Sequence, residues 1–150
     1  MNPEETVKKY FDRWNKGDVD GTAAPLDSEV VVSNLFALQQ KYGLEGFRKG
    51  MAALTKAFPD LNMEITKIVA HGDSVALEEV ETATLKGPLE VATLTIPPTN
   101  RFYELRVACF FRVNAKGLIA EMRNYWDTRT FFQQLGIDLE SFSKLMRSMV

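Results

Sequence analysis

Cysteine and histidine are nearly absent from this sequence of 150 residues, which has one of each. The single cysteine, Cys109, excludes an internal disulfide and favours a reducing compartment, so we expect a cytoplasmic protein. The single histidine, His71, rules out most histidine-based metal sites and any Ser-His-Asp arrangement that needs a second histidine. We therefore expect a protein that works without a metal.

Long apolar runs and a strong charge of either sign are also missing. No stretch approaches the roughly 18 unbroken apolar residues of a membrane span. The 18 basic and 20 acidic residues are interspersed, so neither a membrane nor nucleic acid is an expected partner. The acidic start, Met1–Glu5, begins a helix, and we expect no signal peptide. A hydrophobic content of 45% predicts a single globular domain over residues 1–150.

Helical periodicity dominates the first 60 residues. Asn2 before Pro3 is a typical helix start, and an apolar stripe follows at helical spacing: Val7, Tyr10, Phe11 and Trp14. A strand is predicted over residues 30–35. A second helix ends at Pro59 and carries another apolar stripe: Leu44, Phe47, Met51, Leu54 and Phe58.

Period-two alternation follows and predicts two hairpins, one from residues 62–69 and 74–85, the other from 102–113 and 118–126. A helical region starts near Thr128, and residues 137–150 add a C-terminal helix. Helices followed by an antiparallel meander predict an α+β domain in which helices cover one face of a curved sheet.

Alternation also predicts which side chains face the core. In residues 102–113 every second position is apolar, and the last strand shows a matching face. The two inward sets are Tyr103, Leu105, Val107, Cys109, Phe111 and Val113, and Leu118, Ala120, Met122, Asn124 and Trp126. We interpret four of these residues as walls of a small-molecule pocket, although aromatic stripes of this kind are more often core: Tyr103, Phe111, Met122 and Trp126. Cys109 is interpreted as a small buried hydrophobe in the same wall.

Two carboxylates interrupt the apolar face of residues 74–85. Glu79 and Glu81 lie two residues apart, so they stand about 7 Å apart along a strand. In an apolar cavity one of the two would have a raised pKa, which yields a paired acid and base near neutral pH. This pair is the sharpest chemical hypothesis that the residues support.

The register of the first hairpin decides the hypothesis. Met63, Ile65 and Val69 indicate that odd positions of the preceding strand face inward, which agrees with Glu79 and Glu81 only if the turn has three residues or the strand has a bulge. A one-residue slip would turn both carboxylates to solvent.

Three segments in order resemble the SnoaL-like polyketide cyclases of the NTF2-like superfamily, which includes ketosteroid isomerases and limonene-epoxide hydrolases. The segments are Ile96–Arg101, Phe111–Val113, and Arg123–Asp127 followed by Gln133–Gly136. The resemblance implies a cone-shaped α+β half-barrel, a curved antiparallel sheet wrapped around N-terminal helices, with a deep pocket. It also implies a homodimer, reactions without a cofactor and a small hydrophobic ligand.

The catalytic residues of these relatives do not carry over directly. The cyclase Asp matches Asn124, and the supporting His matches Cys109; an amide cannot abstract a proton. The epoxide-hydrolase pattern fails as well, because its Arg-x-Asp pair falls on Glu79 and Glu81 and its second Asp falls on Asn124. Its water-orienting Asn matches Asn34, whereas the Tyr partner of that residue falls on Val32.

Three hypotheses follow. The first is an isomerase, cyclase or dehydratase type of enzyme, in which Glu79 or Glu81 moves a proton and Asn124 and Asn34 hold a substrate oxygen or a water on an apolar, cyclic substrate. The second is a small-molecule-binding domain that has lost the acid/base residue. The third is a dimeric scaffold.

Overall fold

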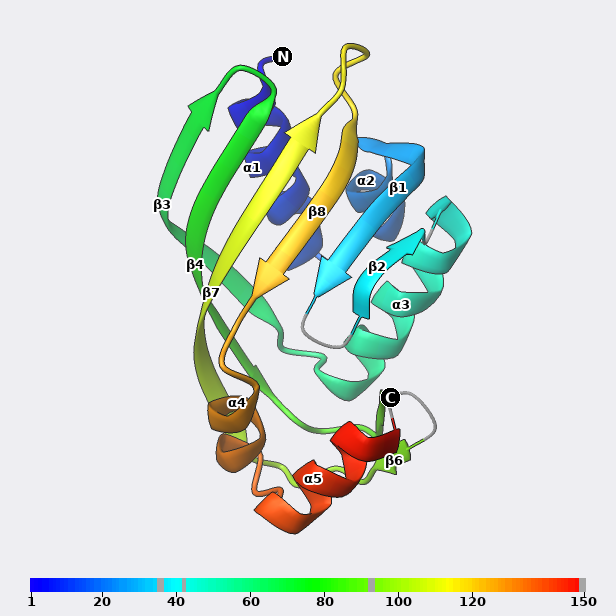
Figure 1. Ribbon diagram of the computed structural model, residues 1–150, viewed down its shortest axis with the longest axis vertical. Coiled ribbons are helices and arrows are strands. Elements are labelled where there is room, and N and C mark those ends of the chain that lie inside the picture. The colour runs from blue at the N-terminus through cyan, green and yellow to red at the C-terminus, as the bar shows by residue number, and fades with distance from the viewer. Residues whose placement is uncertain (35–36, 42, 92–93, 149–150) are drawn as a thin grey trace.

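The computed structural model describes residues 1–34, 37–41, 43–91 and 94–148. Its helices and strands curve around one another in an α+β arrangement (Figure 1). The helices are α1 (Pro3–Asn15), α2 (Val19–Ala23), α3 (Gly43–Ala57), α4 (Thr128–Gln134) and α5 (Leu139–Ser148). The strands are β1 (Leu26–Asn34), β2 (Ala37–Lys41), β3 (Asn62–His71), β4 (Ser74–Thr84), β5 (Leu89–Val91), β6 (Leu94–Ile96), β7 (Phe102–Val113) and β8 (Ile119–Tyr125).

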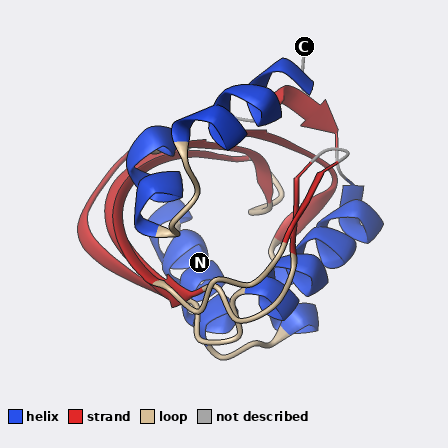
Figure 2. Ribbon diagram, turned by 90° about the horizontal axis from the view of Figure 1, so that it is seen from below, coloured by secondary structure: helices blue, strands red, loops and turns tan. Residues whose placement is uncertain are grey.

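Six strands form one curved sheet in the order β2-β1-β8-β7-β4-β3. The prediction of a wholly antiparallel sheet is wrong at one pair, because β1 and β8 run parallel. The chain leaves β1 through β2 and α3 to the far edge of the sheet, and the meander that starts at β3 then returns to β1 with β8 running in the same direction. Figure 2 shows the sheet curving around the helices without closing.

Short-range signals account for the first helix. The Asn2 side chain accepts from the Glu5 amide at 2.9 Å, and the Glu5 carboxylate accepts from the Asn2 amide at 3.0 Å, which is a capping box. Val7, Tyr10 and Phe11 are buried, as the apolar stripe predicts. None of the described helices is long and apolar enough to cross a membrane.

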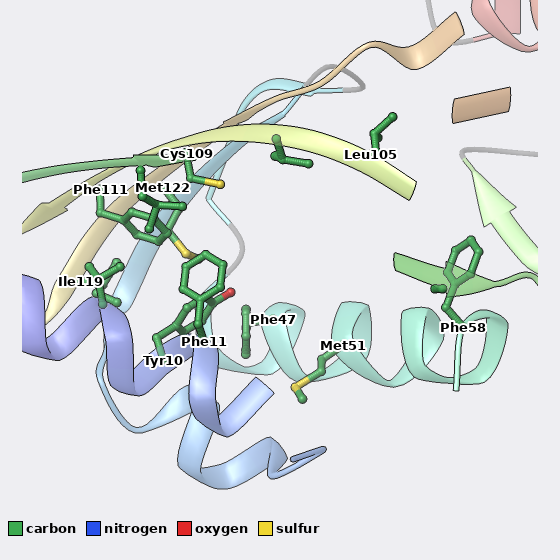
Figure 3. Packing of buried hydrophobic residues seen from close by; sticks show 14 of the residues in the cluster. Tyr10, Phe11, Phe47, Met51, Phe58, Leu105, Cys109, Phe111, Ile119 and Met122 are labelled. Atoms are coloured by element: carbon green, nitrogen blue, oxygen red, sulfur yellow. The ribbon is translucent and has the colours of Figure 1, made fainter. Parts of the chain in front are cut away.

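The core lies between these helices and the inner face of the sheet. Tyr10 and Phe11 of α1 meet Phe111 of β7 edge to face, with ring centroids 6.0 and 5.9 Å apart. Phe47 of α3 packs on Tyr10 at 6.2 Å. Figure 3 shows these side chains gathered between α1, α3 and the strands.

The hairpin of β3 and β4 contains the bulge that the pattern required. His71 pairs with Ser74 across a two-residue turn, and the register shifts between Ile65 and Lys67. Because of this shift, Met63 lies opposite Glu81 and Ile65 opposite Glu79. The prediction for Val69 is wrong: it follows the bulge, lies on the outer face and is 56% exposed.

A second register shift occurs between β7 and β8. Val113 pairs with Ile119, whereas Arg112 pairs with Glu121, so the extra residue falls at Ala120. Ile119 is therefore fully buried, while Leu118 and Ala120 are only partly buried, contrary to strict alternation. Two elements were missed by the period analysis, namely the strand β2 and the hairpin of β5 with β6.

Two side-chain amides cover exposed strand edges. Asn15, at the end of α1, donates to the Met63 carbonyl and accepts from its amide, both at 2.8 Å. Gln134 of α4 accepts from the Glu104 amide at 2.8 Å and donates to its carbonyl at 3.0 Å. Asn15 takes the place of a neighbouring strand at Met63, because β3 is a sheet edge. Gln134 does the same at Glu104 of β7, because β8 pairs with β7 only from Ala108 onward.

Candidate functional site

Glu79 and Glu81 lie at successive inward positions of β4, between the edge strand β3 and β7. Glu79 is 2% exposed and Glu81 is partly buried. The residues directly opposite them on β3 and β7 are all apolar: Ile65 and Val107 beside Glu79, and Met63 and Leu105 beside Glu81. The inward orientation predicted from alternation is therefore confirmed, and both carboxyls occupy an apolar setting.

The hydrogen-bond partners of the two carboxyls differ. The Tyr103 hydroxyl donates to Glu81 Oε1 at 2.5 Å. Glu79 is within hydrogen-bonding reach of the Glu81 carboxyl, but its Oε2 is buried and has no partner among the described residues. Buried polar atoms in native proteins are nearly always paired, so an unpaired carboxyl oxygen is a position that a ligand can complete.

Burial governs the protonation of the pair. Loss of hydration, followed by the neighbouring Glu81 charge and the hydrogen bond with Glu81, raises the pKa of Glu79 to about 9. Burial also raises the pKa of Glu81, against which the hydrogen bonds from Tyr103 and Glu79 act in the lowering direction. Burial thus favours the neutral form of both carboxyls, and Glu81 is the member whose ionised form is stabilised by donors.

Tyr10 and Cys109 are further ionisable groups whose charge state is linked to the pair. Burial, with smaller contributions from the charges of Glu79 and Glu81, raises the pKa of both side chains above their ordinary values. The Cys109 thiol is thus kept protonated, which agrees with its interpretation as a small buried hydrophobe rather than a nucleophile. Tyr10 belongs to the aromatic core, as its helical spacing predicts, and its ring packs on Phe111.

Asn124 does not join the carboxyl pair directly. It pairs with Cys109 across β7 and β8, and Cys109 pairs with Leu77 rather than with either glutamate. Two strand spacings, about 10 Å, therefore separate Asn124 from β4. Asn124 is partly buried on the inner face, where a substrate could span the distance between it and Glu79.

The remaining predicted wall residues lie in the core or pack against it. Phe111 and Met122 are 4% and 3% exposed, and Phe111 is covered by α1. Tyr103 is 1% exposed, with its hydroxyl on Glu81. Trp126 follows β8 and packs on the core in part. Asn34 ends β1, and its side chain lies outside the described part of the chain.

The sequence motifs that suggested a cavity have structural roles at one end of β7. Arg101 lies against Gly136, where an added Cβ would come within 2.9 Å of the arginine Nε. Gly136 itself has a φ of +79°, and Asn100 has a φ of +56°. Together with the Gln134 clamp on Glu104, these contacts attach α4 to the end of the sheet. In this chain the motifs thus hold α4 against that end of the sheet.

Two cavities lie away from the carboxyl pair. One of them, about 350 Å³, is on the outer face of the sheet and is lined by residues such as Val69, Phe110 and Arg123. The predicted deep pocket at Glu79 and Glu81 stays a prediction. Within the described ranges, no three His, Cys, Asp or Glu side chains are grouped so as to hold a metal ion.

Comparison with known proteins shows that several solved structures share the NTF2-like fold of this chain. A SnoaL-like candidate polyketide cyclase from Jannaschia sp. CCS1 has a TM-score of 0.79 at 21% identity, over 91% of this chain and 92% of that one. IdmH from Streptomyces antibioticus, a candidate polyketide cyclase, has a TM-score of 0.74 at 24% identity, over 91% and 100%.

An epoxide-hydrolase relative shares the fold as well. The limonene-epoxide-hydrolase-like protein of M. tuberculosis has a TM-score of 0.70 at 18% identity, over 97% of this chain and 95% of that one. A comparison with curated proteins found no match. The family model for SnoaL-like polyketide cyclases matches residues 4–135, and the chain therefore belongs to that family. The predicted family and the predicted α+β half-barrel are both confirmed.

Proposed function

We propose that this protein is an enzyme that performs acid/base chemistry without a cofactor, using Glu79 and Glu81 as a coupled pair. The observation that carries the proposal is the buried carboxyl pair itself, with one oxygen of Glu79 left without a partner. Burying a carboxyl among apolar side chains lowers the stability of the fold. A carboxyl with a strongly shifted pKa at an inward position is therefore a marker of a functional site.

In the proposed reaction Glu81 is the base and Glu79 is the acid. The Glu81 carboxylate removes a proton from a carbon next to a substrate carbonyl, and Glu79 gives its proton to the substrate oxygen or to a second carbon. The proton taken by Glu81 then passes to Glu79 through the contact between the two carboxyls, which restores the starting state. No net proton is gained or lost, as an isomerisation, cyclisation or dehydration requires.

The substrate proposed for this site is small, apolar and cyclic. The side chains directly opposite the pair carry no hydrogen-bonding groups, so they favour a hydrocarbon ring over a sugar or a phosphate. Relatives named as candidate polyketide cyclases and an epoxide hydrolase are consistent with such a ligand. In this proposal Asn124 holds a substrate oxygen at the far side of the ring.

The test uses a panel of cyclic ketones in heavy water, with loss of acidic carbon-bound protons followed by NMR. Wild type should exchange at least one ketone. Glu81→Gln should lower the rate at least about 100-fold, and Glu79→Gln should do so with little change in affinity. Glu78→Gln, on the exposed face of the same strand, is the matched control and should exchange normally. Ketone binding without exchange in wild type would instead support a binding domain.

We also propose a homodimer formed through the outer face of the sheet. Phe102, Phe110 and Tyr125 are 59%, 42% and 48% exposed there, and Phe110 meets Tyr125 edge to face with centroids 6.0 Å apart. Exposed aromatic groups of this size are typical of protein interfaces. Light scattering should give a dimer mass for wild type and for Lys9→Glu on α1, and a monomer mass for Phe110→Lys. A monomeric wild type would contradict the proposal.

A further inference from the structure

We propose that Tyr103 is the positioning residue that holds Glu81 as the base of the pair and so leaves the transferable proton on Glu79. This inference rests on the proposed function. It adds the Tyr103 hydroxyl as the group that gives Glu79 and Glu81 different roles. The evidence is geometric and lies in the packing around the Tyr103 ring.

The Tyr103 ring is held rigidly. It is 1% exposed and makes edge-to-face contacts with Phe58 of the segment after α3, at 5.4 Å, and with Phe131 of α4, at 4.9 Å. Its Cα lies opposite Ala83, so its side chain reaches Glu81 along the diagonal of the β4–β7 pair. The hydroxyl direction is therefore set by the ring, and the Glu81 carboxyl adjusts to it.

The hydrogen bond from Tyr103 makes the two carboxyls unequal in the donors that they receive. Both have apolar neighbours directly opposite on each side, yet Glu81 alone receives a phenol donor, at 2.5 Å. A donor to a carboxylate stabilises the ionised form. Tyr103 remains a donor because burial and the adjacent Glu81 charge raise its own pKa well above the ordinary value.

Tyr10 provides a matched comparison within the same site. It is a second buried phenol close enough for the charges of Glu79 and Glu81 to act on it. Among the described residues, however, the hydrogen bond to the pair comes from Tyr103, and none joins Tyr10 to either carboxyl. Tyr10→Phe thus removes a hydroxyl of the same kind without removing the proposed interaction.

The experiment records infrared carboxyl bands against pH for wild type, Tyr103→Phe and Tyr10→Phe. Each is measured with and without Glu79→Gln or Glu81→Gln. In wild type at neutral pH, one protonated-carboxyl band should be present and should vanish with Glu79→Gln. In Tyr103→Phe the proton should be shared, so that Glu81→Gln also weakens the band. The midpoint for ionisation of Glu81 should rise by about one pH unit, the tenfold change expected when a charge-assisted hydrogen bond is lost. Tyr10→Phe should leave the band assignment unchanged.

The outcomes separate the two proposals. A wild type without any protonated carboxyl at neutral pH would refute the proposed acid/base function. If Glu79 is protonated in wild type, and Tyr103→Phe changes neither the band assignment nor the midpoint for ionisation of Glu81, the role of Tyr103 is overturned while the proposed function stands. If Tyr103→Phe does not fold, 3-fluorotyrosine at position 103 replaces it: the more acidic phenol should lower the Glu81 midpoint, and no change would overturn the inference.

Discussion

Among the individual residues of the inner face, those that carry charge determine how the protein responds to pH. Glu79 has a folded-state pKa of about 9, raised chiefly by burial, whereas an unfolded glutamate titrates near 4.3. Between these values the folded chain binds more protons than the unfolded chain, so stability falls as pH rises. The stabilising contribution is complete below the unfolded pKa and is lost as pH passes through the folded one.

The corresponding prediction concerns the free energy of unfolding from pH 5 to pH 9. We expect it to decrease in wild type with a slope of at most about 1.4 kcal/mol per pH unit for this one group. Glu79→Gln should flatten the profile and be more stable than wild type at pH 8. Urea titrations at each pH measure this, with Glu78→Gln as the control that should follow wild type. Parallel profiles for wild type and Glu79→Gln would show that Glu79 is not buried as a neutral acid.

The residue scale also shows how far the sequence could be used to predict the site. Alternation identified Glu79 and Glu81 as inward because their neighbours at every second position are apolar, and the bulge before Lys67 made the hairpin consistent. The role of Tyr103 could not be predicted, because a diagonal contact across two strands depends on register and ring packing. Asn124 was placed on the correct face, but its separation from the glutamates depends on strand order.

At the level of secondary-structure elements, α4 is attached to β7 where β7 has no β8 partner. Gln134→Ala removes two hydrogen bonds to the Glu104 backbone and should lower stability by about 1–3 kcal/mol. The Glu104 amide should also exchange with solvent faster, which hydrogen-exchange NMR measures residue by residue. Gln133→Ala, at an exposed position of the same helix, is the control. Unchanged protection at Glu104 would show that the clamp is not formed in solution.

The turn after α4 permits a second test at this scale. Gly136→Ala combines an unfavourable positive φ with displacement of Arg101, whereas Gly117→Ala has a φ of +77° and no atom near the added methyl. The positive φ alone should lower the free energy of unfolding of both variants by about 1–2 kcal/mol, and Gly136→Ala should lose more because it also displaces Arg101. In an Arg101→Ala background this additional loss should disappear. An additional loss that persists without Arg101 would show that Arg101 is not its cause. Thermal unfolding of the four variants provides the comparison.

Element boundaries show why sequence periodicity was incomplete. The long helices α1 and α3 were predicted because their stripes extend over three or more turns. The strands β2, β5 and β6 are three to five residues long, which is too short for a period to be recognised. The parallel pairing of β1 with β8 joins residues about 90 positions apart, and no local pattern contains that information.

For the molecule as a whole, α4 and the turn after it carry three buried side chains near the end of the chain: Phe131, Phe132 and Leu135. A chain that stops at Asp138 keeps all three and should still unfold cooperatively. A chain that stops at Asp127 loses them and should not fold stably. Urea unfolding distinguishes the two, and an unfolded longer chain would contradict the prediction.

The contact of α1 with β7 has a consequence for synthesis of the chain. Phe11 packs on Phe111, and about 100 residues separate them. At about 5–20 residues per second, the ribosome delivers Phe111 roughly 5–20 s after Phe11. During that interval Tyr10 and Phe11 lack their aromatic partner on β7, so the nascent chain presents part of an aromatic helix face to its surroundings. Chaperones that bind apolar segments at the ribosome exit would meet this helix first.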